Sequence, residues 1–425
     1  MKLTLPRSQH GISRGSFSPG ALFVLQKLLQ ARYRAYLVGG CVRDLLLGLT
    51  PKDFDVATNA TPEQVRRVFR NSRIIGRRFR IVHVVFEHEI IEVTTFRSND
   101  DPERSHGQRV SDYSGMLVRD NEFGSSLKED AQRRDFTINA LYYDLSTRSL
   151  IDFHGGLYDL TKGVIDIVGD PAVRYQEDPV RIIRALRFAA KLGFTLSART
   201  AAPVEELAPA LTQVSNARMY EEVNKLFLSG HAVKSYRILR EYALLEILLP
   251  PLHSCLGQPG CHEFLEYALK SSDERCAAGK RNVPHFLYAV LLWYAFEAEV
   301  LRLQQLNGSL ITELPFERLC ARAASTVLNT QNPVPAVPAF PAQNIRALWM
   351  LQFLLAVPGD ESRTLIERHH LFRGGFDLLK LRAHFEPLLE DAVERWQPLY
   401  DIVSRIAQSA TRQRSLSERT GSLKR

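Results

Sequence analysis

The sequence predicts an α+β protein in which a head of mixed strands and helices precedes a long, entirely helical part. Strand and helix signals are mixed over about the first 160 residues, whereas helical periodicity dominates the remainder of the 425-residue chain. The hydrophobic fraction of 45% and the charged fraction of 24% are ordinary for globular proteins, so the composition excludes a disordered or fibrous chain. A chain of this length is compatible with two or three domains.

The predicted elements of the head follow from capping residues, turn residues and β-rich runs. Ser18 and Pro19 suit the N-cap and the first position of a helix, and Thr61-Pro62-Glu63-Gln64 has the pattern of a capping box. Glu87-His88-Glu89 separates two β-rich runs that are most simply paired as a hairpin. Residues 98–115 are polar and rich in glycine and serine, and we expect them to form a loop. The expected elements are a helix over 18–34, a strand over 35–38, a helix over 42–47, a strand over 54–56, a helix from 61, and strands over 81–86 and 90–96.

The helical part is divided by short breaks and by one proline-rich segment. PVPAVPAFP, residues 333–341, is expected to be extended. The expected amphipathic helical segments are 179–193, 200–229, 231–248, 262–272, 284–304, 343–357 and 361–407. The chain is therefore divided into a flexible N-terminus at 1–20, a head at 21–160, a helical neck at 161–230, a helical body and tail at 231–410, and a disordered basic end at 411–425.

Charge and cysteine content narrow the class of protein. The 55 Lys and Arg residues against 47 Asp and Glu give a net charge of +8, which favours polyanionic partners such as nucleic acid. The five cysteines form no CxxC pair, which argues against a disulfide framework and favours a reducing compartment. The N-terminus lacks the apolar run of a secretory signal, and the longest apolar stretch, 286–296, is too short to span a bilayer. We therefore expect a soluble, cytoplasmic protein.

The strongest local signal is GGCVRDLLLGLTPKDFDVAT, residues 39–58. The turn at Gly39-Gly40 enters a helix, so its backbone N–H groups and the helix dipole favour a phosphate, and Arg43 adds charge. Asp53 and Asp55 alternate along the predicted strand, whose period of two puts both carboxylates on one side. Two oxygen ligands on one face suit Mg²⁺. The pattern predicts nucleotidyl transfer, and its alternative is a simple turn followed by a capped strand end.

Four further motifs extend this signal in a fixed order. They are RRDFTINALYYD (133–144), DFHGGLYDL (152–160), EDPVRIIRALRFAAKLGF (177–194) and the pair Arg218 and Glu222. Together with residues 39–58 they resemble the signature of the class II polymerase-β-like nucleotidyltransferases, over about residues 35–225. That superfamily contains the tRNA CCA-adding enzymes and the bacterial poly(A) polymerases. The resemblance implies a polymerase-β-like head of mixed sheet and helices, followed by an all-α neck, body and tail.

One stretch of the sequence distinguishes bacterial poly(A) polymerases from CCA-adding enzymes. IIGRRFRIVHVVF, residues 74–86, resembles the bacterial poly(A) polymerases, whereas CCA-adding relatives usually carry a Gly-Thr-Val-like sequence there. The resemblance thus implies template-independent addition of AMP from ATP to RNA 3′ ends, with release of pyrophosphate and two Mg²⁺ ions at the site. The alternatives are a CCA-adding enzyme that uses CTP and ATP on tRNA, and a catalytically idle RNA-binding protein on the same fold.

The resemblance also implies catalytic roles for three carboxylates. Asp53 and Asp55 match the metal ligands of the family, and Asp135 matches the acidic residue of its RRD motif. An alternative for Asp135 is a salt-bridged cap of a helix that starts near Phe136. Glu92 lies on the predicted strand over 90–96 and is a second candidate for the third carboxylate.

The nucleotide-binding residues expected from the resemblance are Gly39, Gly40, Arg43, Arg133, Arg134, Asp178, Arg181, Arg184 and Arg187. Guanidinium forks bind phosphate oxygens, which suits Arg133 and Arg134. Asp178 and Arg181 belong to the motif that reads the incoming base, although Asp178 is also a good N-cap. The expected partners are ATP and the 3′ ends of mRNA, small RNA and decay fragments, with an RNA chaperone and the RNA-decay machinery as further candidates. We expect a monomer.

Overall fold

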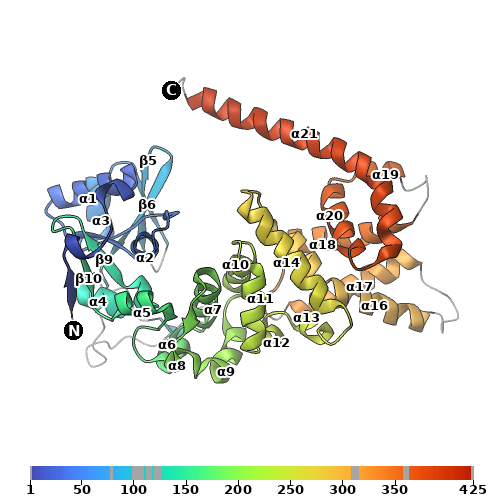
Figure 1. Ribbon diagram of the computed structural model, residues 1–425, viewed down its shortest axis with the longest axis horizontal. Helices are drawn as coiled ribbons and strands as arrows, with labels where there is room; N and C mark the ends of the chain where they lie inside the picture. The colour runs from blue at the N-terminus through green and yellow to red at the C-terminus, as the bar shows by residue number, and fades with distance from the viewer. Residues whose placement is uncertain are drawn as a thin grey trace. The chain divides into compact units, whose positions relative to one another are not determined.

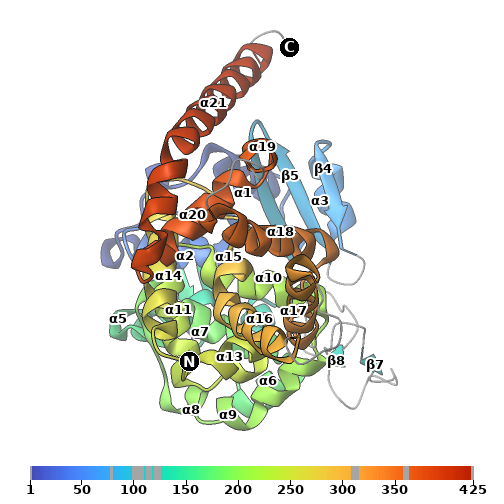
Figure 2. The same ribbon diagram turned by 90° about the vertical axis from the view of Figure 1, so that its right-hand side faces the viewer.

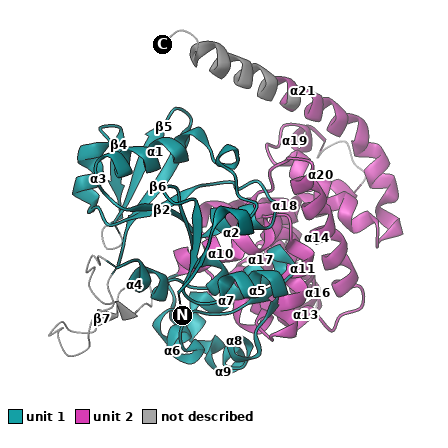
Figure 3. Ribbon diagram, turned by 60° about the vertical axis from the view of Figure 1, so that its left-hand side comes forward, with its two compact units in different colours: residues 1–215 teal, residues 216–425 magenta. Residues whose placement is uncertain are grey.

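The computed structural model describes residues 2–76, 80–97, 110–111, 117–118, 126–307, 315–332, 334–357 and 363–422. The chain forms two compact units, residues 1–215 and 216–425 (Figure 3). The first unit contains the β-sheet, and the second is built from helices. The predicted α+β class, with a mixed head followed by a helical part, is therefore confirmed. The boundary between the units falls inside the predicted neck at 161–230.

An eight-stranded sheet with the order β1-β10-β9-β2-β3-β6-β5-β4 forms the centre of the first unit. The strands are β1 (Leu3–Leu5), β2 (Ala35–Val38), β3 (Asp55–Thr58), β4 (Ser72–Ile75), β5 (Ile81–Phe86), β6 (Glu89–Thr95), β9 (Leu141–Asp144) and β10 (Ser149–Asp152). Its neighbouring strands are antiparallel except for β3 and β6, which are parallel. Two two-stranded sheets are formed by β7 (Val110–Ser111) with β8 (Leu117–Val118) and by β11 (Val164–Ile165) with β12 (Thr195–Leu196).

The helices of the first unit start where capping residues predict. The hydroxyl of Ser18 accepts from the Ala21 N–H at the start of α1, and Thr61 and Gln64 form the predicted capping box of α3. Helices α1 and α3 pack on the sheet (Figure 1). The helices are α1 (Pro19–Gln30), α2 (Gly40–Leu46), α3 (Pro62–Val68), α4 (Leu127–Gln132), α5 (Gly156–Lys162), α6 (Pro171–Glu177), α7 (Val180–Leu192), α8 (Ala198–Ala201) and α9 (Val204–Leu207).

Three predictions for the head need correction or fall outside the description. The expected flexible N-terminus at 1–20 contains β1, which adds an edge strand by pairing Leu3 with Asp152. The strand expected over 54–56 begins at Asp55 instead, so Asp53 lies in the bend before it. The expected loop over 98–115 lies outside the described residues except for β7. The predicted hairpin, in contrast, is confirmed as the antiparallel pair β5 and β6.

The second unit consists of helices from α10 to α21, several of which Figure 2 shows facing the viewer. They are α10 (Asn216–Phe227), α11 (Ala232–Glu241), α12 (Leu245–Leu248), α13 (Pro250–Cys255), α14 (Cys261–Ala277), α15 (Pro284–Leu291), α16 (Trp293–Asn307), α17 (Phe316–Gln331), α18 (Ala339–Ala356), α19 (Arg363–Glu367), α20 (Phe372–Ala383) and α21 (Glu390–Ser422). None of the described helices has the length and apolarity that a bilayer span requires.

Helix boundaries differ from the predictions at three places. The segment expected over 200–229 is broken into short helices before α10 begins at Asn216. The proline-rich segment is non-helical only as far as Pro338, which precedes α18, and the helix contains Pro341. The expected disordered end at 411–425 instead continues α21 as far as Ser422.

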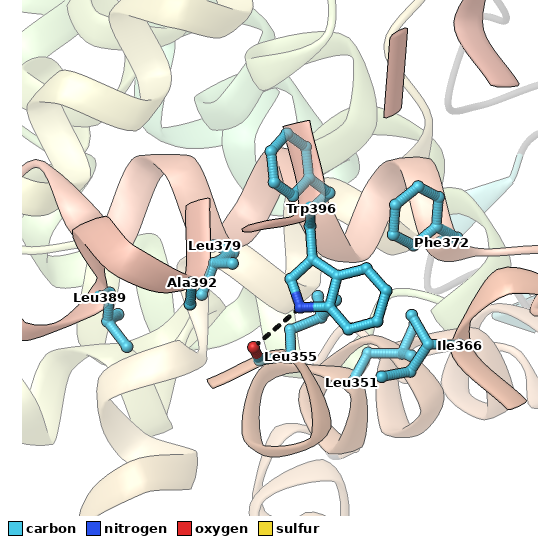
Figure 4. Packing of buried hydrophobic residues seen from close by; sticks show 9 residues of the cluster. Leu351, Leu355, Ile366, Phe372, Leu379, Leu389, Ala392 and Trp396 are labelled. Atoms are coloured by element: carbon cyan, nitrogen blue, oxygen red, sulfur yellow. Dashed lines mark hydrogen bonds between the residues drawn. The ribbon is translucent and has the colours of Figure 1, made fainter. Parts of the chain in front are cut away.

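A buried apolar cluster joins α18, α20 and α21 in the second unit (Figure 4). The Trp396 side chain is 4% exposed, and its indole N–H donates to the Leu355 carbonyl over 3.1 Å. The other buried members are Leu351, Ile366, Phe372, Phe376, Leu379, Leu389 and Ala392. Because Trp396 combines apolar burial with a satisfied polar group, it anchors the first turns of α21.

We predict that Trp396→Ala lowers the free energy of unfolding of the second unit by about 3–5 kcal/mol, because it leaves a large cavity. All three tryptophans, Trp293, Trp349 and Trp396, lie in this unit, so urea titration followed by tryptophan fluorescence reports on it. Ile406→Ala on the same helix is the matched control, because Ile406 is 62% exposed. Equal midpoints for both variants would contradict the anchoring role.

Candidate active site

The candidate site is centred on the turn between β2 and α2. Gly39 has a φ of 79° and a ψ of −138°, a combination that side-chain-bearing residues rarely adopt. A Cβ atom at Gly39 would lie 3.6 Å from Arg134 Nη1 and 3.7 Å from Asp55 Oδ2. The turn therefore lies against both a carboxylate and a guanidinium that come from distant parts of the sequence.

Asp55 and Glu92 lie side by side on the parallel strands β3 and β6. The register pairs Asp55 directly with Glu92, and paired residues of adjacent strands point to the same face of a sheet. The pKa of Asp55 is raised to about 6, mainly by burial and then by the charge of Glu92, whereas Arg134 opposes the rise and Asp53 adds a smaller increase. The strand alternation that we expected to align Asp53 with Asp55 does not apply, since Asp53 precedes β3. The influence of Asp53 on Asp55 nevertheless means that its charge is near.

A buried network fixes Arg134. Its Nε donates to the Tyr142 hydroxyl over 2.8 Å, and its Nη2 donates to Asp130 Oδ2 over 3.1 Å. The Tyr142 hydroxyl itself donates to the same Asp130 oxygen over 2.7 Å. Burial lowers the pKa of Arg134, but Tyr142 and Asp130 outweigh this effect and raise it. Sequence analysis assigned no role to Tyr142 or Asp130, although both lie in or beside the RRD motif.

The carboxylate of Asp135 accepts hydrogen bonds from a backbone N–H, from an asparagine and from an arginine. Its Oδ1 accepts from the Phe136 N–H and from Asn139, and its Oδ2 accepts from Nε and Nη2 of Arg184 over 3.1 and 2.5 Å. Burial would raise its pKa, but Arg184 outweighs the burial, and the pKa falls to about 2. Asp135 thus remains ionised and orients Arg184. A short 3₁₀ turn, Thr137–Asn139, follows it in place of the helix expected near Phe136.

Arg43, which we expected to add positive charge for a phosphate at the Gly39-Gly40 turn, is buried. It is 3% exposed, and its Nε and Nη2 donate to Asp44 while its Nη1 donates to the Asn139 side chain over 2.7 Å. Its guanidinium also lies 5.2 Å from the centre of the Phe188 ring. These contacts connect α2 with the segment after the RRD motif, which gives Arg43 a role in holding the site together.

Helix α7 contributes two arginines that contact the same aromatic ring as Arg43. Arg184 and Arg187 lie 5.6 and 4.6 Å from the centre of the Phe188 ring. Guanidinium groups are attracted to ring faces, so Phe188 helps to gather positive charge beside the Asp135 carboxylate. The nucleotide-binding candidates Arg184 and Arg187 are therefore clustered with Arg43 around Phe188.

Asp178 and Arg181 lie where α6 passes into α7. Asp178 is 5% exposed, and its Oδ1 accepts from the Val180 N–H over 3.3 Å, as the capping alternative predicts. Arg181 Nη1 donates to the Arg174 carbonyl over 2.7 Å and to Glu177 over 3.2 Å. Burial lowers the pKa of Arg181, and the neighbouring charge of Arg174 acts in the same direction. The base-reading role of this pair stays a prediction.

Among the described residues, no group of three or more His, Cys, Asp and Glu side chains is arranged closely enough to hold a metal ion by itself. This finding agrees with the chemistry of Mg²⁺, which is commonly held by one or two carboxylates and completed by water and substrate phosphates. The carboxylate pair on β3 and β6 is the feature of the site that fits such an ion.

Family models match most of the chain in three segments. A model described as the Poly A polymerase head domain matches residues 35–166. A second, described as a probable RNA and SrmB-binding site of polymerase A, matches 193–256, and a third, the polymerase A arginine-rich C-terminus, matches 313–425. The first match spans the whole carboxylate and RRD region of the candidate site.

Relatives and solved structures agree with these matches. Poly(A) polymerase I of Salmonella typhi is 44% identical over 388 residues, which cover 90% of this chain and 82% of the relative. Poly(A) polymerase I of Haemophilus influenzae is 42% identical over 91% of this chain and 85% of the relative, whereas the CCA-adding enzyme of Bacillus subtilis is 37% identical over 61% of this chain and 62% of that enzyme.

The crystal structure of the Bacillus stearothermophilus CCA-adding enzyme in complex with CTP has a TM-score of 0.61 at 27% identity, over 90% of this chain and 83% of that chain. The nucleotidyltransferase resemblance is thereby confirmed. On the extent and the identity of these matches, the chain belongs to the poly(A) polymerase family of nucleotidyltransferases.

Proposed function

We propose that this chain adds AMP units from ATP to the 3′ ends of RNA without a template and releases pyrophosphate. The observation that carries the proposal is the pairing of Asp55 with Glu92 beside the Gly39 turn and Arg134. This arrangement brings carboxylates for a cation and a guanidinium for phosphates to one place, as nucleotidyl transfer requires. Identity of 44% over 90% of the chain to a poly(A) polymerase supports adenylate as the unit that is transferred.

The carboxylates fit the Mg²⁺ ions that we expected. Asp53 and Asp55 would hold two ions, and Glu92 is the third carboxylate rather than Asp135. The raised pKa of Asp55 supports this assignment, because like charges close together are relieved by a bound cation. Bound Mg²⁺ would make the RNA 3′ hydroxyl a better nucleophile and would neutralise the charge of the leaving pyrophosphate. Asp135 acts as a positioning residue for Arg184.

Arginines of the site would bind the triphosphate. Arg134 is oriented towards the Gly39 turn by Asp130 and Tyr142, and Arg184 is oriented by Asp135. Guanidinium groups that are already oriented lose little conformational freedom when they bind phosphate. Arg133 and Arg187 remain candidates for the same role, and Gly39 and Gly40 would allow close approach of the nucleotide to the backbone. Arg43 would support the turn rather than contact phosphate.

RNA would be bound by the helical part of the chain. The family models of an RNA-binding site and of an arginine-rich C-terminus support this, as does the net charge of +8. Binding to the RNA backbone through Lys and Arg should weaken steeply with salt. A cytoplasmic location, a monomeric state, and contacts with an RNA chaperone or the RNA-decay machinery stay predictions.

The first prediction concerns the substrate. Purified wild-type protein with Mg²⁺ should produce long ladders with ATP alone, on an unstructured RNA and on tRNA that lacks its terminal CCA. Addition that stops after three nucleotides on tRNA and needs CTP would instead establish the alternative, a CCA-adding enzyme. Asp55→Ala should lower the rate by on the order of 10²- to 10³-fold or more. Full polymerisation activity in Asp55→Ala would contradict the assignment of Asp55 as a metal ligand. It would favour a carboxylate pair that takes no part in catalysis.

The second prediction separates the two candidates for the third carboxylate. Glu92→Gln should raise the Mg²⁺ concentration for half-maximal activity, because it removes a negative charge beside Asp55. Asp135→Asn should leave the Mg²⁺ dependence unchanged and raise the KM for ATP, because it releases Arg184. Titration of activity against Mg²⁺ and against ATP checks both variants. The reverse pattern would assign Asp135 to the metal.

The third prediction concerns stability in the absence of metal. Because the pKa of Asp55 rises from 3.8 to about 6 on folding, its ionisation costs the folded state up to about 3 kcal/mol. The contribution of Asp55 to the free energy of unfolding is fully present below its pKa in the unfolded state, 3.8. It is lost as the pH rises through its pKa in the folded state, about 6. In EDTA, Asp55→Asn should therefore have a higher Tm than wild type at about pH 8 and a similar Tm at about pH 4. A lower Tm for this variant at about pH 8 would contradict the assigned repulsion.

A further inference from the structure

Arg174 on α6 binds the backbone of both arginines of the RRD motif. Its Nη2 donates to the Arg133 carbonyl over 2.9 Å and to the Arg134 carbonyl over 2.8 Å. Its Nη1 donates to Glu177 over 2.7 Å, and the Arg174 side chain is only 12% exposed. The guanidinium is therefore held from one side by its own helix and grips a segment 40 residues earlier in the chain.

Arg174 donates to backbone carbonyls at the C-terminal end of α4. Arg133 is the C-cap of α4, so the carbonyls of Arg133 and Arg134 lie at the end of that helix, where carbonyls lack intrahelical partners. A cation at a helix C-terminus is also favoured by the helix dipole. Loss of the Arg174 guanidinium would remove the Nη2 donor from both carbonyls. The direction of the Arg133 and Arg134 side chains would then be less defined.

Arg174 has a second connection through its own backbone. Its carbonyl oxygen accepts from Arg181 Nη1 over 2.7 Å, and Arg181 shares Glu177 with Arg174. The side chain of Arg174 thus fixes the proposed phosphate-binding pair, while its backbone fixes the proposed base-reading arginine.

We propose that Arg174 is a positioning residue that couples recognition of the base at Arg181 to placement of Arg133 and Arg134. This inference rests on the proposed function. It goes beyond that function because it explains how the wrong base would slow the reaction as well as weaken binding. Arg181 holds the Arg174 carbonyl when no base is bound, so a base that engages Arg181 acts on this contact, and Arg174 transmits the displacement to the backbone at 133–134.

The test compares Arg174→Lys and Arg174→Met with Arg199→Lys. Lysine keeps the charge but has a single nitrogen, so it cannot donate to Glu177 and to the two carbonyls from the fixed planar positions that Nη1 and Nη2 occupy. Arg199 is the matched control, because its guanidinium also donates to two backbone carbonyls, those of Gly169 and Ile167, and pairs with Asp166. Steady-state kcat and KM are measured for ATP and for CTP on an unstructured RNA, and Tm is measured for each variant.

Arg174→Lys should lower kcat for ATP by on the order of 10- to 100-fold, because small misplacement of reacting groups is costly. It should also lower the preference for ATP over CTP in kcat/KM by about 10-fold. Arg199→Lys should leave both quantities within about twofold of wild type, although its Tm should also fall because it loses the same kinds of hydrogen bond. A merely structural role for Arg174 would lower Tm without changing the preference between nucleotides.

A double variant decides whether the coupling passes through Arg181. If it does, Arg174→Lys with Arg181→Lys should lose little more nucleotide preference than Arg181→Lys alone. Additive losses would overturn the coupling, and so would a wild-type preference in Arg174→Lys. Should Arg174→Met fail to fold, the lysine variant still decides. Failure of wild type to extend RNA with ATP would overturn the proposed function, whereas an active wild type with an indifferent Arg174→Lys would overturn only the coupling.

Discussion

The candidate site depends on holding negative charges close together in a partly buried sheet. Asp55 and Glu92 are adjacent because β3 and β6 are parallel and in register, and backbone hydrogen bonds fix this register. Burial is the main cause of the raised pKa of Asp55, the charge of Glu92 adds to the rise, and Arg134 opposes it. Because a cation relieves repulsion between carboxylates, this pairing supports the proposal that the sheet holds a metal ion beside a phosphate-bearing substrate.

Four arginines of the candidate site and its surroundings are oriented by acidic or hydroxyl groups. Asp130 and Tyr142 hold Arg134, Asp135 holds Arg184, and Glu177 holds Arg174 and Arg181. A carboxylate offers two oxygens to a guanidinium fork, so such pairs fix direction as well as position. Arginines that are fixed in this way lose less freedom on binding a substrate, which is the physical basis of preorganisation. Asp135 and Glu177 therefore act mainly on arginines, whereas Asp178 accepts from the Val180 N–H.

The structural features that were predicted correctly depend on residues that are close together in the sequence. The caps at Ser18 and Thr61 involve residues three positions away, and the hairpin of β5 and β6 involves adjacent strands. The types of residue in the candidate site were also predicted, because they occur in short motifs. Their partners were not, since Arg43 pairs with Asn139 and Asp135 with Arg184 across 96 and 49 positions. Such contacts are created by the tertiary fold, and no local pattern reports them.

The fold is shared by enzymes that differ in the nucleotides they add. The CCA-adding enzyme of Bacillus stearothermophilus covers 90% of this chain with a TM-score of 0.61, yet the poly(A) polymerases are closer in sequence over a similar extent. The choice of nucleotide must therefore depend on side chains that a common fold positions. His83 belongs to the stretch that favours a poly(A) polymerase, and its Nε2 lies 3.4 Å from Glu92 Oε1. The stretch that we expected to distinguish the two kinds of enzyme is thus in contact, through His83, with a carboxylate of the candidate site.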